Sequence, residues 1–218
     1  MKKVCVKILG NEKTQFIAIP VFSILLSLIV GMVIIAGLGK YPLTAYMNLL
    51  QGSGLMPKPN YSAYQGMLTD FTSFLNMLTP MMFAALSVAV AQKAGLFNIG
   101  VSGQMLAAGF VATVTVGYSE LPAVAAKPLV LLIGIVVGMA VGALVGFLKY
   151  QFNINEVVST IMINCIVQYL TSFFINTRYI DEISRQSKAV SRASRLTLMQ
   201  VPIGNLKVDI PLCIILAV

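Results

Sequence analysis

The sequence predicts an all-α polytopic membrane protein, and its composition and charge spacing support that fold class. Hydrophobic residues make up 58% of the chain and charged residues 10%, well below the roughly 25% charged residues of soluble domains. The charges lie between long apolar runs, several of which reach the roughly 20 residues that a helix needs to cross about 30 Å of hydrocarbon. A soluble core of this size would need a polar surface that the chain lacks.

Five uncharged apolar runs are long enough to form membrane-spanning helices. They cover residues 16–38, 71–92, 94–119, 128–148 and 157–177. A sixth run starts at residue 210 and reaches residue 218, which is too short to cross a bilayer. We expect it either to lie at the interface or to start a span of a longer protein. The second explanation is preferred, so residues 16–218 are predicted to be a transmembrane domain truncated at its C-terminus.

A basic tail, residues 1–15, precedes the first run and contains Lys2, Lys3, Lys7 and Lys13. A signal peptide also begins with positive charge, but this apolar run exceeds the usual 7–15 residues and no clean cleavage site follows it. We interpret the run as a retained helix with its tail in the cytoplasm, as the positive-inside rule predicts. Alternation of the later spans then places residues 149–156 inside and residues 178–209 outside.

The predicted outer loop, residues 178–209, conflicts with the positive-inside rule. It carries six basic residues, Arg178, Arg185, Lys188, Arg192, Arg195 and Lys207, against Asp181, Glu182 and Asp209. A strict charge count would place a loop of this length in the cytoplasm. A re-entrant or broken element over residues 94–119 would resolve the conflict by giving an even number of crossings.

The third run contains a polar and glycine-rich interruption. Residues 91–110 place three polar side chains, Lys93, Asn98 and Gln104, close to Gly95, Gly100 and Gly103 in an apolar context. A lipid-facing helix with these side chains is costly, so the segment must face protein or water. The glycines permit a broken helix, and the two amide side chains can satisfy the freed backbone groups. A simple cytoplasmic hairpin between two spans is the alternative, and the pattern alone favours neither.

Two further patterns concern helix packing and capping. Gly134, Gly138, Gly142 and Gly146 recur every four residues and so lie along one helical face, which predicts close helix packing, with a pore-lining role as the alternative. Asn155 and Glu156 are expected to cap the following helix. Ser159, Thr160 and Asn164 continue along that helix and are expected to form interhelical hydrogen bonds, and a place on a substrate path is a further hypothesis for Asn164.

Residue types and motifs argue against catalysis by this chain. Histidine is absent, and the three cysteines show no CxxC spacing, so neither a metal site nor a disulfide framework is expected. No Walker A, GxSxG or HExxH motif occurs, so another subunit would have to bind any ATP. The basic outer loop lacks interleaved aromatic residues, so we expect it to dock an acidic extracellular partner and not a nucleic acid.

Two sequence stretches resemble a known family. The run TPMMFAALSVAVAQKAGLFNIGVSGQMLAAGF and the later NINEVVSTIMIN are similar to permease subunits of bacterial ATP-binding cassette (ABC) importers for nucleosides, which are related to ribose and branched-chain amino acid permeases. The resemblance implies the N-terminal part of a ten-helix, type II-like permease bundle in the bacterial plasma membrane. It also implies a second permease subunit, identical or different, two cytoplasmic ATPase subunits and an extracytoplasmic solute-binding lipoprotein.

The same resemblance assigns roles to individual residues. Residues 95–104 match the family's broken-helix signature near the middle of the membrane, and Asn98, Gln104 and Asn164 become candidates for the translocation path. Ser102 occupies a position where relatives usually carry Glu, which argues against an ion pair there. The coupling loop that contacts the ATPase normally lies beyond residue 218, which supports the expected truncation and implies that this piece alone does not transport.

The predicted function is therefore that of a permease subunit without enzymatic activity or cofactor, which moves a nucleoside or related small polar solute by alternating access. A sugar or a branched-chain amino acid is the alternative solute. An ion-coupled secondary carrier is the alternative mechanism, but such carriers usually place an acidic residue inside a span, and none of the five runs contains Asp or Glu. A membrane scaffold would not explain the polar interruption.

Overall fold

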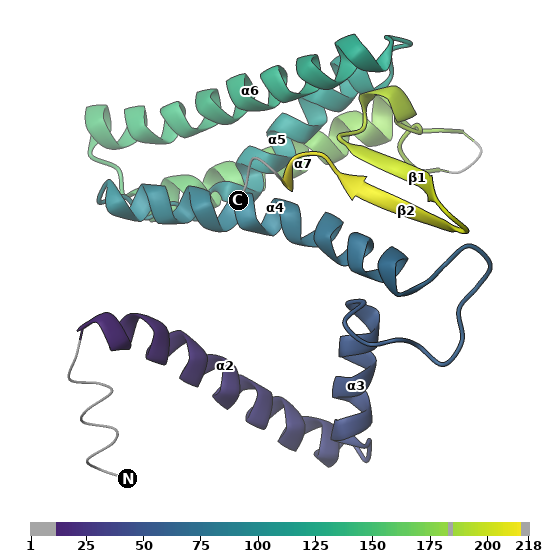
Figure 1. The fold of residues 1–218 in the computed structure, drawn as a ribbon. Coiled ribbons are helices and arrows are strands. Elements are labelled where there is room, and N and C mark those ends of the chain that lie inside the picture. Colours follow the sequence, from purple (N-terminus) through teal and green to yellow (C-terminus); the bar gives the residue numbers. More distant parts are fainter. Residues whose placement is uncertain (1–11, 183–184, 215–218) are drawn as a thin grey trace.

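The structure, a computed structural model, describes residues 12–182 and 185–214 (Figure 1). Residues 1–11 of the predicted basic tail and residues 215–218 of the sixth run lie outside the described residues. The order of elements is α2 (Glu12–Gly37), α3 (Pro42–Gly52), α4 (Met67–Lys93), α5 (Val101–Ala112), the π-helix η1 (Thr113–Gly117), α6 (Ala123–Phe152), α7 (Glu156–Arg178), the 3₁₀ helix η2 (Arg192–Ser194), β1 (Thr197–Ile203) and β2 (Leu206–Pro211).

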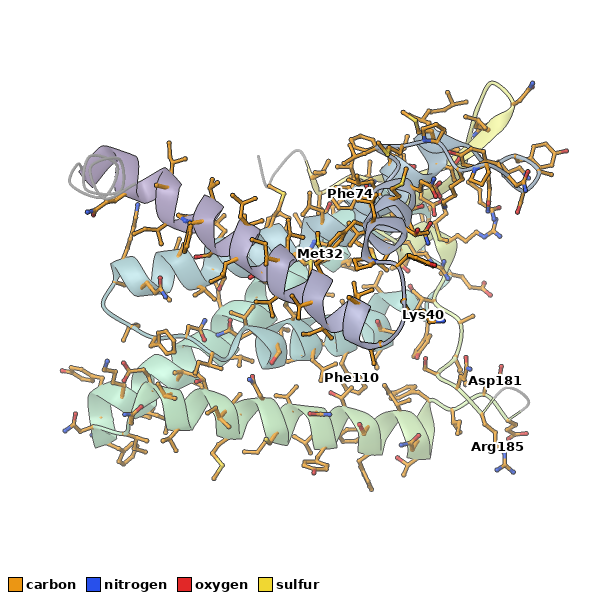
Figure 2. The ribbon with its side chains drawn as sticks, turned by 90° about the horizontal axis from the view of Figure 1, so that it is seen from below. Met32, Lys40, Phe74, Phe110, Asp181 and Arg185 are labelled. Atoms are coloured by element: carbon orange, nitrogen blue, oxygen red, sulfur yellow. The ribbon has the colours of Figure 1, made fainter. Side chains whose placement is uncertain are left out.

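The predicted helical membrane fold is confirmed. Four helices of the described chain are long and apolar enough to cross a membrane: Ile17–Gly37, Met67–Lys93, Ala123–Phe152 and Glu156–Arg178. Their large apolar side chains stand outward, as Met32 and Phe74 do at 42% and 40% exposure (Figure 2). Exposed apolar helix surfaces of this kind are stable in lipid or against other membrane helices, because water would penalise them.

Residues 94–119 do not form the single long span that we expected. Helix α4 ends at Lys93, residues 94–100 are not helical, and α5 with η1 comprises only 12 residues of α-helix and five of π-helix. The expectation of five continuous spans is therefore wrong at this run. Two residues explain the break. Gly95 has a φ of +73°, a backbone conformation that a residue with a side chain disfavours. The Asn98 side chain accepts a hydrogen bond from Gly100 N, which would bond a backbone carbonyl in a continuous helix.

The broken segment nevertheless carries the chain from one end of the bundle to the other. Helix α5 runs parallel to α7, and three contacts mark that direction: the Gly103 N–H donates to Asn164 Oδ1, the Phe110 and Phe174 rings stack, and the Tyr118 and Tyr179 rings stack. The end of η1 and the end of α7 therefore lie at the same end of the described bundle.

The basic loop consequently lies at the same end of the bundle as the first long loop. Ser191 N donates to Gly117 O at 2.9 Å, and Lys207 N donates to Tyr64 O at 2.9 Å, so the basic loop contacts both the end of η1 and the first long loop, which leads into α4. The break therefore does not relieve the conflict with the positive-inside rule. The sidedness of this end in the membrane stays a prediction.

The outer loop contains a β-hairpin that the sequence analysis missed. Strands β1 and β2 pair antiparallel from Thr197–Pro211 to Ile203–Leu206, and β2 packs against α4. Ile210 and Pro211 belong to β2, so the sixth apolar run does not begin a helix at residue 210 as expected; helical structure starts at Ile214. Gly204 (φ +59°) and the residue after it form a two-residue Gly-Asn turn, a sequence signal for a hairpin that the apolar runs on either side obscured.

The glycine stripe on α6 does not make the expected close helix contact within the described residues. A Cβ atom at Gly134, Gly138 or Gly146 would have nothing within 4 Å, and at Gly142 it would meet only Gln104 Nε2 at 3.5 Å. Helix packing at the stripe therefore stays a prediction that concerns surfaces outside the described chain. Among the described residues, the tight glycine contacts of α5 lie at its beginning, against α7.

Helices α2 and α3 form a separate pair beside the bundle (Figure 1). The Tyr46 hydroxyl donates to the Leu28 carbonyl and joins the two helices. A side chain on Gly31 would collide with the same tyrosine hydroxyl, which lies 2.9 Å from the Cβ position. This glycine therefore permits the α2–α3 contact.

Candidate functional site

The break between α4 and α5 begins with a hydrogen-bonded helix stop. Gly95 N donates to Gln92 O at 3.0 Å and Leu96 N donates to Ala91 O at 2.9 Å, the bond pattern of a Schellman motif with Gly95 in the left-handed position. Lys93, which the sequence analysis counted with the polar interruption, is exposed at the end of α4. It lies outside the cluster of polar residues described next.

Asn98 and Gln104 lie together at the beginning of α5. Asn98 Oδ1 accepts a hydrogen bond from Gly100 N at 2.9 Å, and its Nδ2 approaches Gln104 Oε1 at 3.5 Å. The first bond satisfies a backbone donor that the broken helix leaves without a helical partner, while the second is long and weak. Gln104 is therefore held loosely, with its Nε2 facing Gly142 of α6.

Asn164 of α7 holds the break from the other side. Its Nδ2 donates to Ile99 O at 3.1 Å, and its Oδ1 accepts from Gly103 N at 2.9 Å. One side chain thereby satisfies a carbonyl and an amide that the interruption freed, in a region where unpaired backbone groups cost several kcal/mol each. The structure brings all three predicted path residues, Asn98, Gln104 and Asn164, around residues 99–104.

Two glycines allow α5 to approach α7 closely enough for these bonds. A Cβ on Gly103 would collide with Asn164 Oδ1 and lie 3.0 Å from Asn164 Cα, and a Cβ on Gly100 would lie 3.1 Å from Thr160 Cγ2. Thr160 is fully buried and its hydroxyl donates back to the Glu156 carbonyl at 2.8 Å, so its methyl group is left to face Gly100. The glycines therefore act as contact surfaces as well as helix breakers.

A small cavity of about 110 Å³ opens beside this cluster, and we call it the inner cavity. Its lining includes Asn98, Gln104, Gly142, Gly146, Thr160 and the Lys149–Glu156 ion pair, whose Nζ and Oε1 atoms are 2.9 Å apart. The predicted Asn155 cap is confirmed, because its Oδ1 accepts from Val157 N at 2.8 Å at the start of α7. The cavity thus offers amide donors and acceptors beside the Lys149–Glu156 ion pair, whose charges cancel.

The comparisons with known proteins agree with this architecture. The family described as branched-chain amino acid transport system / permease component matches residues 71–218, which include α4, the break, α6, α7 and the hairpin. The chain belongs to this permease family. The resemblance inferred from the two sequence motifs is therefore confirmed, and the chain is part of a multi-pass membrane protein.

Three relatives from the comparisons carry transport names. The nucleoside ABC transporter permease protein NupB of Lactococcus lactis is 30% identical, covering 83% of this chain and 48% of the relative. The guanosine ABC transporter permease protein NupP of Bacillus subtilis is 30% identical, covering 84% and 49%. The glucose ABC transporter permease protein TsgB13 of Haloferax volcanii is 31% identical, covering 72% and 38%. No solved structure matches the chain significantly.

The chain spans about half the length of the first two of these relatives. The described residues build one polar cluster at the N-terminal end of α5, which we call the inner end, and a second polar region at its C-terminal end, which we call the outer end. The second region contains Asn76, Arg195 and Thr197, none of which the sequence analysis selected as a path residue. Arg195 was assigned to a solvated loop, because no sequence pattern distinguishes it from Arg185 and Arg192.

Proposed function

We propose that this chain is the N-terminal part of the permease subunit of an ABC importer that moves a nucleoside or a closely related neutral polar solute. The observation that carries the proposal is the gathering of Asn98, Gln104 and Asn164 around a helix break between membrane helices. Family membership over residues 71–218 and two relatives named as nucleoside and guanosine permeases support the same reading.

The chemistry of the cluster suits a neutral solute. An amide side chain carries both donors and an acceptor, as hydroxyl groups and nucleobase edges require. Asn164 uses both on the backbone of the break, so Gln104, which makes only a 3.5 Å contact with Asn98, is the amide best placed to bind a solute. The Lys149–Glu156 pair neutralises its own charges at the inner cavity, so no isolated charge there would attract an ion. Dispersed hydrogen-bonding groups on an otherwise apolar wall are typical of sites for small amphipathic molecules.

Transport would proceed by alternating access driven from outside this chain. Separate ATPase subunits would bind and hydrolyse ATP, and their closure would move this permease against a second permease subunit. An extracytoplasmic binding lipoprotein would deliver the solute. The permease itself would form no covalent bond and would contribute only the path, its hydrogen-bonding groups and the movement of its helices.

Uptake by the assembled transporter in proteoliposomes tests this function. We expect uptake of radiolabelled uridine to need ATP on the ATPase side, to need the binding lipoprotein, and to persist when an ionophore dissipates ion gradients. Uptake that survives ATP removal and stops with the ionophore would establish an ion-coupled carrier instead. Unlabelled glucose or leucine that competes better than uridine would redirect the solute assignment to sugars or amino acids.

A further inference from the structure

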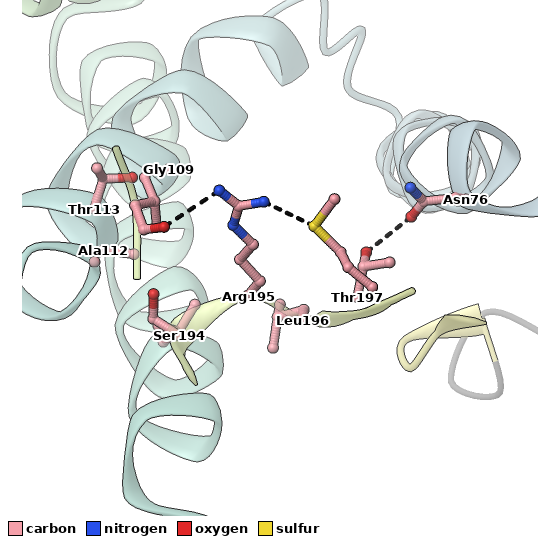
Figure 3. A pocket seen from close by; sticks show the side chains of 12 residues that line it. Asn76, Gly109, Ala112, Thr113, Ser194, Arg195, Leu196 and Thr197 are labelled. Carbon is pink, nitrogen blue, oxygen red and sulfur yellow. Dashed lines mark hydrogen bonds between the residues drawn. The ribbon is translucent and has the colours of Figure 1, made fainter. Parts of the chain in front are cut away.

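Arg195 differs from its basic neighbours in the outer loop. Arg185 and Arg192 are exposed, whereas Arg195 is half-buried and its guanidinium turns into a cavity of about 350 Å³, which we call the outer cavity (Figure 3). Its Nη2 donates to Val190 O at 3.2 Å and its Nη1 contacts Met199 Sδ at 2.7 Å. A thioether sulfur is a weak acceptor, and no carboxylate of the described chain pairs with this cation.

Hydrogen bonds and packing contacts fix the backbone around Arg195 and thereby the direction of its side chain. Ser191 N donates to Gly117 O at 2.9 Å, and Ser194, which is 4% exposed, donates its hydroxyl to Ser191 O at 2.9 Å. Val190 lies against Gly117, where a Cβ atom would be 3.2 Å from its methyl group. These contacts hold the segment 190–195 across the end of η1 and direct Arg195 inward.

The outer cavity has the size and lining of a small-molecule site. Its volume falls in the range of about 300–1,000 Å³ that is usual for ligand pockets. Apolar groups such as Val130 and Leu196 line it together with Asn76, Thr113 and Thr197. The Thr197 hydroxyl donates to Asn76 Oδ1 at 2.8 Å, and no acceptor of the described chain bonds the Asn76 amide nitrogen, which leaves that donor for a ligand (Figure 3).

The two cavities lie at opposite ends of α5. Gln104 in the first turns of the helix lines the inner cavity, and Gly109 and Thr113 at its other end line the outer cavity. A solute that arrives at the end of the bundle with the basic loop would therefore meet the outer cavity before it reaches the polar break.

We propose that the outer cavity is a binding site for the transported solute, in which Arg195 and the Asn76 amide donate to its hydroxyl and carbonyl oxygens; this rests on the proposed function. The ligand class is a neutral molecule with neighbouring hydroxyl groups, such as the ribose of a nucleoside. Hydroxyl groups need both donors and acceptors; the Thr197 hydroxyl, whose proton goes to Asn76, offers an acceptor, and the guanidinium and the Asn76 amide offer donors. The apolar wall fits the uncharged remainder of a nucleoside, and binding of a carboxylate by the Arg195 guanidinium is the competing outcome that leucine tests below.

Cysteine protection in the assembled transporter tests the site without relying on transport. In a background without native cysteines, Leu196→Cys places a thiol in the outer cavity, and Leu198→Cys, two residues along the chain in β1 and outside the lining, is the matched control. We expect uridine to slow the reaction of the first thiol with a membrane-impermeant methanethiosulfonate at least severalfold and to leave the second unchanged. Arg195→Lys should raise the uridine concentration for half-protection about tenfold, because it loses the planar donor pair.

The controls separate this site from the proposed function. Arg192→Lys should leave protection unchanged, because Arg192 is exposed and does not line the cavity. Asn76→Ala should weaken protection as a second, uncharged variant. ATP-dependent uridine uptake without protection at Leu196→Cys would overturn the site and leave the function standing. A thiol at this position that never reacts, or that leucine protects better than uridine, would also overturn the proposal.

Discussion

The two ends of α5 differ in how completely their polar groups are hydrogen-bonded. At its inner end, Asn164 pairs with backbone groups of the break, and two glycines allow α5 and α7 to pack without a gap. At its outer end, the helix widens into a π-turn beside a cavity that holds a cation with one weak and one ordinary acceptor. A saturated contact gives rigidity, and an unsaturated one leaves binding capacity, so we expect Asn164 to anchor the break, while Gln104 at the same end and Arg195 at the other keep hydrogen-bonding groups for a ligand.

The largest difference should appear when a methyl group is added to each end. Gly103→Ala places a Cβ against Asn164, whereas Gly109→Ala, on the same helix, meets nothing within 4 Å. We expect the first change to destabilise the protein by roughly 1–3 kcal/mol through overpacking and the second to be neutral or slightly stabilising. Thermal unfolding of the detergent-purified transporter measures both. Equal unfolding temperatures would show that the inner end is not tightly packed.

Removal of the Asn164 side chain should have the next largest effect. Asn164→Ala leaves Ile99 O and Gly103 N without their partner, and the buried Gly103 N alone should cost about 1–3 kcal/mol when it is left unsatisfied. Asn176→Ala, at an exposed position of the same helix, is the matched control. Hydrogen exchange of residues 99–104 should accelerate only in the first variant. Unchanged exchange would mean that the break is held by other contacts.

Gln104 separates a path role from an anchoring role. Its side chain makes only a 3.5 Å contact with Asn98 among the described hydrogen bonds, so Gln104→Leu should leave the unfolding temperature within a few degrees of the wild type. We expect ATP-dependent uridine uptake to fall several-fold, because an amide of the inner cavity is lost. Ser102→Ala, at an exposed position two residues earlier, is the control. Normal uptake by Gln104→Leu would remove this residue from the path.

The smallest expected effect concerns the exposed cations of the outer loop. Arg185→Gln together with Arg192→Gln should weaken binding of the solute-binding lipoprotein a few-fold at low salt and flatten its salt dependence, as expected for rim charges that steer association. Arg195→Gln should leave both quantities unchanged, because its guanidinium points into the outer cavity. Binding in nanodiscs at two ionic strengths provides the measurement. A matching loss in Arg195→Gln would make all three residues part of one docking surface.

The sequence was a sufficient guide where local chemistry decides structure. Long uncharged runs predicted the four long helices, and Asn155 predicted its cap, because apolar length and capping depend on neighbouring residues alone. The glycines and amides at 95–104 indicated a break, while the partner that completes it, Asn164, lies about sixty residues away and shows no pattern that specifies the pairing. The glycine stripe of α6 illustrates the converse, since a regular spacing did not reveal which surface it meets.

The outer end of α5 was also hard to predict from the sequence, because its structure depends on contacts between residues that are far apart in the chain. Whether Arg195 faces solvent or a cavity depends on how residues 190–195 cross η1, and that crossing is fixed by Gly117 and two serines whose roles are set by tertiary contact. The hairpin was overlooked because its second strand merges into an apolar run that was assigned to a helix. Only the Gly-Asn turn at residue 204 indicated a hairpin strand in place of a helix.

The side chain of Asn164 has a mechanical consequence. It fastens the first turn of α5 to α7, and ring stacking joins the same two helices further along, so the two helices form one packed unit. The non-helical stretches that flank α5 and η1, residues 94–100 and 118–122, are the places where this unit connects to the rest of the chain. We expect any displacement of α7 in the assembled protein to move α5 with it, and these two stretches to absorb the change in direction.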